Sequence, residues 1–280
     1  MNIIYTSGIL HITDTPFDPQ LTLIDSAQVF HWRKLSANEY GAVIGGRSVL
    51  LLAEDNGFSL SPIKEDDIPF WRHYFDLDRD YAAIAESCAA YPTAQRAMQL
   101  LPGMRVLNQP PWEALVSFII SANNNVSRIR GLVEKLIDRF GEEGSFPTPE
   151  QLSSVSEESL RSLGFGYRAP YLIKTAQIIQ DGFPLETLRD LPYEEAHRQL
   201  LSLPGVGDKV ADCVQLFGTG HSEAFPIDVW VERLMKHWFL PDAHGKREIS
   251  RKAHEMFGRN AGIVQQSLFH CARLGLIPLD

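Results

Sequence analysis

Two residues in the C-terminal half of the chain combine an amine with a carboxylate at positions that suit covalent catalysis. Lys209 lies in the first turn of a predicted helix, directly after residues 203–207, LPGVG. The positive end of a helix dipole disfavours a cation there and favours the neutral amine, which is the form that acts as a nucleophile. Asp228 follows at the start of a second apolar helix, where backbone N–H groups can hold its carboxylate in place.

The segment 203–207 predicts a tight hairpin that could contact a phosphate. Proline fixes its own φ, and Gly205 and Gly207 tolerate positive φ without a Cβ clash. A helix that opens after Gly-x-Gly exposes unpaired N–H groups and the positive end of its dipole, so the backbone at Gly205, Val206 and Gly207 is a candidate anion site. On this motif alone, the lysine could equally be a phosphate contact and the aspartate a simple cap.

Length and composition describe an ordinary globular protein and exclude several classes. The chain has 280 residues, of which 44% are hydrophobic and 22% charged, enough for one large domain or two smaller ones. Its three cysteines are widely separated, so they predict neither a disulfide framework nor a CxxC metal pair. No membrane-spanning run or targeting segment is recognised, so we expect an intracellular protein of the cytoplasm or nucleoid with no membrane partner.

The net charge of −9 argues against a uniformly basic nucleic-acid binder. The acidic excess is larger in residues 1–104, with 7 Lys/Arg against 13 Asp/Glu, than in residues 105–280, with 19 against 22. A DNA-binding surface would therefore be a local patch that neutralises few phosphates, and the salt dependence of binding would be modest.

Residues 1–60 predict an antiparallel sheet of four or five strands. Gly45-Gly46 is a hairpin signal between two β-prone segments. The β-prone segments are 21–23, 29–32, 40–44 and 48–52. Residues 61–80 predict an acidic connector with a short helix, and helices are expected at 81–90 and 94–101.

From about residue 109 onward the chain predicts helices. Residues 127–140 place apolar side chains on one helical face, and Gly141 ends that helix. Further helices should start near Thr148 and Ser156, and others are expected at 171–180, 194–203 and within 254–275. The fold class is therefore α+β, with an N-terminal antiparallel sheet domain and its connecting helices at 1–105 and a helical domain at 106–280.

The segment 203–228 resembles the helix-hairpin-helix DNA glycosylases, whose signature is a hairpin, a Gly/Pro-rich loop and an aspartate. Within that superfamily, KVADC at 209–213 followed by PIDV at 226–229 is similar to the 8-oxoguanine DNA glycosylase/lyase branch. The resemblance implies that Lys209 is the nucleophile, that Asp228 is its catalytic partner and that the hairpin contacts DNA. It also implies a TBP-like sheet domain beside a helical HhH-GPD domain, with the active site in a cleft between helical subdomains.

Two loops carry candidates for contacts with the opposite strand. Asn123 opens a run of three asparagines that precedes Arg128, a pattern that is more often a polar loop with a cap. Its resemblance to the family's segment implies that Asn123 and Arg128 read the estranged cytosine. Tyr167 and Arg168 follow a glycine-rich turn that is often only a packed loop, although a tyrosine there can also wedge between base steps. The resemblance implies Tyr167 as the wedge and Arg168 as a second cytosine contact.

Four residues are candidates for a pocket that holds an extruded base. Gln265 and Phe269 are four apart and offer an amide and an aromatic face, although a core Phe with a solvent-facing Gln would give the same pattern. The resemblance implies these base contacts and places Cys213 on the opposite side of the base. Where the family uses a glycine carbonyl to accept the N7–H that distinguishes 8-oxoguanine from guanine, this chain has Ala27. Trp230 is a second departure, because animal members of the family carry a His there.

The resemblance implies a bifunctional base excision repair enzyme. Such an enzyme excises 8-oxoguanine from duplex DNA through a Schiff base on Lys209 and cleaves the abasic site by β-elimination. It implies damaged double-stranded DNA as the partner, a monomer, no required cofactor and no catalytic metal, although hairpin carbonyls could hold a non-catalytic cation.

Two alternatives stay open. The first is another glycosylase of the superfamily, for alkylated or other oxidised bases. Lys209 argues against the alkylbase enzymes, and three scattered cysteines argue against members with a four-cysteine iron–sulfur motif. The second is a non-catalytic helix-hairpin-helix module, which would explain the hairpin but not the pairing of Lys209 with Asp228.

Overall fold

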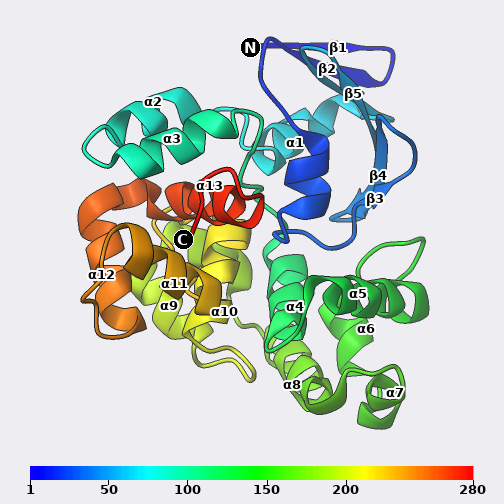
Figure 1. Ribbon diagram of the computed structural model, residues 1–280. Coiled ribbons are helices and arrows are strands. Elements are labelled where there is room, and N and C mark those ends of the chain that lie inside the picture. The colour runs from blue at the N-terminus through cyan, green and yellow to red at the C-terminus, as the bar shows by residue number, and fades with distance from the viewer. Residues whose placement is uncertain (280) are drawn as a thin grey trace.

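The N-terminal part of the computed structural model, which describes residues 1–279, is a six-stranded antiparallel sheet (Figure 1). The strand order is β1-β2-β6-β5-β4-β3. Gly45 and Gly46 form the β4–β5 turn with φ of 54° and 74°, which confirms the predicted hairpin. The strands are β1 (Asn2–Thr6), β2 (Ile9–Thr13), β3 (Arg33–Lys34), β4 (Glu39–Ile44), β5 (Arg47–Glu54) and β6 (Gly57–Ser61).

Two of the predicted strands are wrong. Residues Gln20–Asp25 form a helical turn, η1, whose Leu21 N–H donates to the Asp18 carboxylate at 2.8 Å. Residues 29–32 approach β3 without pairing as a strand. The apolar residues of both segments are buried, so their hydrophobicity reflects packing against the sheet and the helices rather than strand pairing.

Helix α1 (Ile68–Tyr74) packs against the sheet in an aromatic core, which confirms the short helix expected in the connector. Trp32, Phe58 and Phe75 are buried there, and the Trp32 indole N–H donates to the Tyr74 hydroxyl at 2.8 Å. Burial of these large side chains stabilises the sheet from one side.

The remaining helices form two lobes (Figure 1). One lobe, drawn in green, contains α4 (Pro111–Ser121), α5 (Val126–Phe140), α6 (Pro149–Ser153), α7 (Glu157–Ser162) and α8 (Ala169–Gln180). The other lobe contains α2 (Tyr81–Ser87), α3 (Pro92–Leu100), α9 (Tyr193–Leu200), α10 (Asp208–Val214), α11 (Val229–Trp238), α12 (Lys246–Phe257) and α13 (Ala261–Arg273). Helices α4 and α10 contact each other across the junction between the lobes.

Local sequence signals explain several helix boundaries. The Asn125 side chain accepts the Arg128 N–H at 2.9 Å to begin α5, and Gly141 caps its end as predicted. Thr148 and Ser156 cap α6 and α7, which confirms both predicted starts. Helix α12 begins at Lys246, earlier than expected from the sequence.

Polar contacts fix the sheet to the helices around the segment that follows η1. The Glu113 carboxylate on α4 accepts the Gly45 N–H at 2.8 Å and lies 3.3 Å from the His31 ring. The Gln28 amide donates to the Arg105 carbonyl at 2.9 Å, within the connection that leads into α4. A division of the chain at residue 105 stays a prediction. No helix within residues 1–279 is long and apolar enough to cross a membrane.

Candidate active site

The hairpin between α9 and α10 is a close-packed turn that places the start of α10. Gly205 has φ of 79°, a conformation that favours glycine. A Cβ at this position would also lie 2.9 Å from the Cβ of Tyr171, so both the backbone conformation and the lack of space require glycine here. Gly207 differs from the prediction, because it is extended at φ −108° and serves as the N-cap residue of α10. The Thr175 hydroxyl of α8 donates to the Pro204 carbonyl at 3.0 Å and anchors the hairpin to the opposite lobe.

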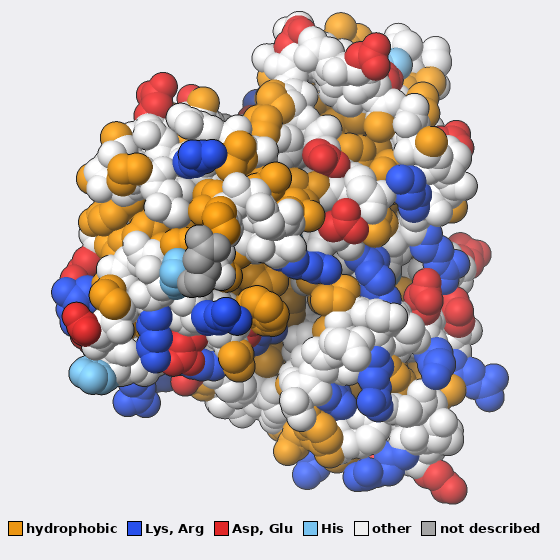
Figure 2. Space-filling model, in the orientation of Figure 1, with side chains coloured by type: hydrophobic (Ala, Val, Ile, Leu, Met, Phe, Trp, Pro, Cys, Tyr) orange, Lys and Arg blue, Asp and Glu red, His pale blue; other side chains and the backbone are white. Residues whose placement is uncertain are grey.

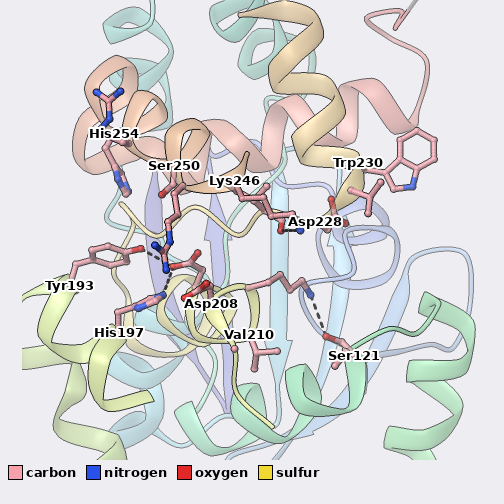
Figure 3. Close-up of a pocket in the computed structure, with 18 of the residues that line it drawn as sticks. Ser121, Tyr193, His197, Asp208, Val210, Asp228, Trp230, Lys246, Ser250 and His254 are labelled. Atoms are coloured by element: carbon pink, nitrogen blue, oxygen red, sulfur yellow. Dashed lines mark hydrogen bonds and ion pairs between the residues drawn. The ribbon is translucent and has the colours of Figure 1, made fainter. Parts of the chain in front are cut away.

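Lys209 occupies the first turn of α10, where the sequence placed it, and its amine points toward the end of α4. The Nζ atom lies 3.3 Å from the Ser121 hydroxyl, the contact drawn at Ser121 in Figure 3, and 5.4 Å from the centre of the Phe118 ring. The side chain is partly buried. An amine held between a hydroxyl and an aromatic face has few orientations open to it, which favours a fixed direction of attack.

Asp228 is the N-cap of α11, as predicted. One of its carboxylate oxygens accepts the Val231 N–H at 2.8 Å, which fixes the carboxylate before any charge develops nearby. The Lys246 ammonium at the start of α12 donates to the carbonyl of the preceding residue, Ile227, at 3.1 Å, and Figure 3 shows Lys246 beside Asp228. The carboxylate therefore faces the space around Lys209 from a rigid helix start.

Two cavities meet at these residues. The smaller has a volume of about 150 Å³ and the larger, an open cleft, about 1310 Å³. Four residues line both cavities: Ser121, Asn124, Lys209 and Asp228. The amine and the carboxylate therefore lie where the small cavity joins the open cleft.

The small cavity, called the base pocket from here on, contains all four residues that the sequence proposed for it. They are Ala27, Cys213, Gln265 and Phe269. Burial, the largest influence, raises the pKa of the Cys213 thiol to about 11, so this wall is an uncharged thiol at neutral pH. Ala27 adopts φ of 58°, the left-handed conformation that glycine favours.

Sequence reasoning missed other walls of the base pocket. Phe118 and Phe217 line it and stack with ring centres 5.3 Å apart. His270 is buried behind Phe269 with their ring centres 5.0 Å apart, and burial lowers its pKa to about 4, so its ring is neutral at neutral pH. These residues gave no separate signal, because apolar and buried positions in a helix look alike whether they pack against protein or line a pocket.

The two loops proposed for the opposite strand come together beside the start of α5. Asn123 is exposed with φ of 49°, and the Arg128 guanidinium donates to the Gly164 carbonyl at 3.4 Å. Tyr167 is 47% exposed and its hydroxyl donates to the Ala122 carbonyl at 3.0 Å. An exposed, anchored ring suits a wedge between base steps.

Arg168 differs from the other loop candidates because it is buried. Its guanidinium donates to the carbonyls of Ala122 and Asn123, each at 3.1 Å. In this arrangement Arg168 positions the loop that carries Asn123, and a contact between Arg168 and a base requires these bonds to be shared or exchanged.

The open cleft is lined by polar and charged side chains. Tyr193 donates to the buried Asp212 carboxylate at 2.8 Å, and His197 lies 3.4 Å from the same oxygen, which raises the pKa of His197 through that hydrogen bond (Figure 3). Lys246, Arg247 and Arg251 of α12 line the other side. Trp230 also lines the cleft and is 58% exposed. Within residues 1–279 no group of three His, Cys, Asp or Glu side chains is arranged to hold a metal ion.

Comparison with known families covers nearly the whole chain. Residues 116–259 match the family described as HhH-GPD superfamily base excision DNA repair protein. Residues 9–115 match the family described as 8-oxoguanine DNA glycosylase, N-terminal domain. The two matches together include the base pocket residue Ala27 as well as Lys209 and Asp228.

Similar proteins include two curated relatives. The chain is 31% identical to N-glycosylase/DNA lyase OGG1 of Arabidopsis thaliana, over 93% of this chain and 78% of that protein. It is 32% identical to a probable N-glycosylase/DNA lyase of Methanothermobacter thermautotrophicus, over 72% of this chain and 73% of that protein.

Two solved structures superimpose on nearly the whole of this chain. MBOgg1 in complex with a low-affinity DNA ligand superimposes with a TM-score of 0.92 at 32% identity, covering 99% of both chains. The 8-oxoguanine glycosylase/lyase of Clostridium acetobutylicum, bound to double-stranded DNA with cytosine opposite 8-oxoG, gives a TM-score of 0.90 at 29% identity and also covers 99% of both chains.

Proposed function

The chain belongs to the HhH-GPD superfamily of base excision DNA repair proteins, and we propose that it is a DNA N-glycosylase and abasic-site lyase that removes 8-oxoguanine from duplex DNA. The observation that carries this proposal is the position of Lys209 and Asp228 on the shared wall of the base pocket and the open cleft. A glycosidic bond that joins a base in the pocket to a strand in the cleft must cross that wall.

The first step is extrusion of the damaged nucleotide. Tyr167 wedges into the stack, and the base enters the base pocket between Phe269 and Cys213, which offsets the cost of unstacking, a few kcal/mol. The Gln265 amide reads the Watson–Crick edge, and the Ala27 carbonyl accepts the N7–H of 8-oxoguanine. Asn123 and Arg128 contact the cytosine left behind.

Base removal follows at the boundary between the two cavities. The neutral amine of Lys209 forms a bond to C1′ as the C1′–N9 bond breaks, and the base leaves with the bonding electrons. Positive charge builds on the sugar, and the Asp228 carboxylate stabilises it because its orientation is already fixed by the Val231 N–H. The amine then loses its extra proton, which balances the proton that the departing base takes up.

Strand cleavage uses the same covalent link. The sugar ring opens as the nitrogen lone pair forms the C=N bond of a protonated Schiff base and the C1′–O4′ bond breaks, and O4′ takes up a proton from water to become a hydroxyl. Loss of a proton from C2′ then expels the 3′ phosphate by β-elimination, and water releases Lys209. The amine and carboxylate supply this chemistry without an organic cofactor.

The strand itself would bind along the open cleft. Gly205 and Gly207 of the hairpin line one side, and basic residues of α12 line the other. Val206 lies between the two glycines with its side chain buried in the core, so only its backbone could contact DNA. The hairpin carbonyls of Leu203 and Pro204 accept hydrogen bonds from the Val206 N–H and the Thr175 hydroxyl, and we propose no chemical role for a cation held there. We expect the protein to act as a monomer on the DNA inside the cell.

Borohydride trapping on a duplex with 8-oxoguanine opposite cytosine tests the proposal. The native protein should give a covalent protein–DNA band, and Lys209→Gln should give none. Lys236→Gln, on α11 and paired with Glu232, is the matched lysine control and should trap normally.

Three other results are informative. Base release without trapping would replace the lysine mechanism with water directed by Asp228. Trapping on duplexes with another oxidised base, but not on this one, would move the proposal to another glycosylase of the superfamily. Equal binding to damaged and undamaged duplex without either reaction would overturn it in favour of a non-catalytic binding module.

A further inference from the structure

The turn that presents Ala27 to the base pocket, residues 24–27, is held by two arginines from different lobes. Arg130 on α5 donates to the Ile24 carbonyl. Arg273, the last residue of α13, donates to the Asp25 carbonyl at 2.8 Å. Both arginines lie in segments that resemble the family, but the resemblance assigns neither of them a role.

Ala27 is the residue in this turn that needs outside support. Its φ of 58° lies in the left-handed region, where the Cβ of an L-residue crowds the following carbonyl oxygen. Asn and Asp can compensate through side-chain hydrogen bonds, but the alanine methyl cannot. Glycine, which the resembled family has here, would adopt the same conformation without this cost.

Other hydrogen bonds hold the ends of the turn but do not replace the arginines. The Ser26 hydroxyl donates to the Thr22 carbonyl at 2.7 Å, and Gln28 donates to the same carbonyl at 3.2 Å. These bonds lie within η1 and just after its end. The bonds from Arg130 and Arg273 instead tie the turn to α5 and α13, the helices that frame the base pocket, and His270 of α13 also hydrogen-bonds the Ser26 backbone.

The arginine pair is costly, which argues that it is more than incidental. Burial lowers the pKa of Arg130, and the nearby positive charge of Arg273 lowers it further, while Asp25 and Glu134 act in the opposite direction. Two cations that repel each other are kept on one short turn. Hydrogen bonds from charged donors are among the stronger ones, so together they can hold a strained backbone.

We propose that Arg130 and Arg273 are positioning residues for lesion discrimination, because they hold the turn 24–27 so that the Ala27 carbonyl is aimed into the base pocket. This inference rests on the proposed function. Each arginine shares a helix with a residue proposed to contact DNA: Arg130 follows Arg128 on α5, and Arg273 lies one turn after Phe269 on α13. The turn is therefore connected through α5 to the loop that carries Asn123 and Arg128, and through α13 to Phe269 in the base pocket.

The test compares excision with strand cleavage in the full chain. The variants are Arg130→Gln, Arg273→Gln and the pair together, with Arg139→Gln as the control, an exposed arginine on the same helix as Arg130. Single-turnover excision is measured on 8-oxoguanine opposite cytosine, and lyase activity on a duplex with a preformed abasic site. The double variant should lose about tenfold or more in excision, keep its lyase rate and melt as a folded protein, whereas Arg139→Gln should match the native protein in both.

Ala27→Gly provides a rescue that a general structural role would not give. In the double variant it should restore most of the lost excision, because glycine holds the turn without support. Equal loss of excision and lyase activity, or no rescue by Ala27→Gly, would overturn the inference, and so would normal excision by the double variant. If the native protein excises no 8-oxoguanine, the proposed function fails at that earlier step, so the two failures are distinguishable.

Discussion

The base pocket and the open cleft share four residues but differ in size and in the chemistry of their walls. The base pocket, at about 150 Å³, has aromatic walls, a neutral thiol and a neutral histidine behind it. The cleft, at about 1310 Å³, is lined by basic, acidic and hydroxyl groups. Figure 2 shows the same contrast at the surface, with hydrophobic side chains inside the hollow between the lobes and Lys and Arg near its rim. On the proposed function, this difference predicts that base selection and strand binding use separate surfaces that meet at Lys209 and Asp228.

The strongest test of this comparison removes charge from the shared wall. Asp228→Asn keeps an oxygen that can accept the Val231 N–H, so the cap and the fold should survive with a change of less than about 1 kcal/mol in unfolding free energy. Excision should fall by about 100-fold to 1000-fold, because the fixed negative charge is lost. Single-turnover rates and a urea titration measure the two effects. A loss below about tenfold would show that the carboxylate acts mainly as a cap.

The second test uses the two histidines that flank the cavities. Because the folded pKa of His270 is lowered from near 6.5 to about 4, its contribution to stability is complete above pH 6.5 and lost as the pH falls toward 4, by about 3 kcal/mol. His197 has a raised pKa, so its contribution is present below its unfolded pKa and lost as the pH rises through the folded value. Urea titrations from pH 4 to 8 on the native protein, His270→Asn and His197→Asn measure the free energy of unfolding at each pH. They separate the contribution of His270 from that of His197.

In His270→Asn, the free energy of unfolding should fall less between pH 6.5 and 4 than in the native protein. Its dependence on pH above 6.5, to which His197 contributes, should stay the same. A native stability that stays constant from pH 6.5 to 4 would show that the wall behind Phe269 is not the dry, neutral environment inferred here.

The third test separates the two surfaces by reaction. Phe269→Ala removes a stacking face and should lower excision of 8-oxoguanine by roughly 10-fold to 100-fold, in line with about 1–3 kcal/mol for base stacking. Cleavage of a preformed abasic duplex needs no base in the pocket, so its rate should stay close to native. Both rates are read from one denaturing gel. An equal loss of both would mean that the base pocket and the cleft do not act separately.

The smallest effect is expected in the cleft. Lys246→Gln removes one exposed cation beside Asp228 and should weaken binding to damaged and undamaged duplexes by the same factor. If Lys246 contacts a phosphate, the slope of log affinity against log salt should fall by about 0.9. Fluorescence anisotropy at several salt concentrations measures this slope. A change in the preference for damaged duplex would contradict the assignment of α12 to strand binding.

The positions of Lys209 and Asp228 at two helix starts are easier to predict from the sequence than the sheet is. Lys209 and Asp228 could be predicted because a cation and a carboxylate at helix starts are local features with a limited set of explanations. The sheet was harder, because its short strands are defined by partners distant in the sequence, as β2 pairs with β6. Residues 21–23 looked like a strand because buried helical turns and buried strands have similar compositions.

Side-chain roles that depend on packing could not be predicted at all. The sequence gives no sign that the Arg168 guanidinium donates to two backbone carbonyls, and its contact with cytosine stays a prediction. Arg130 and Arg273 drew no attention, because a charged residue on a helix gives no sign of the backbone it reaches from another part of the chain. Such contacts appear only when the tertiary structure is known.

The base pocket also has a consequence for synthesis of the protein. Ala27 comes from the first part of the chain and Phe269 from the last helix, whereas the hairpin and Lys209 lie between them. On the proposed function, a chain still emerging from the ribosome would contain Lys209 before the Gln265 and Phe269 wall of the base pocket has been synthesised. A product that stops before α13 would lack that wall and the contacts of α13 with α3, α11 and α12.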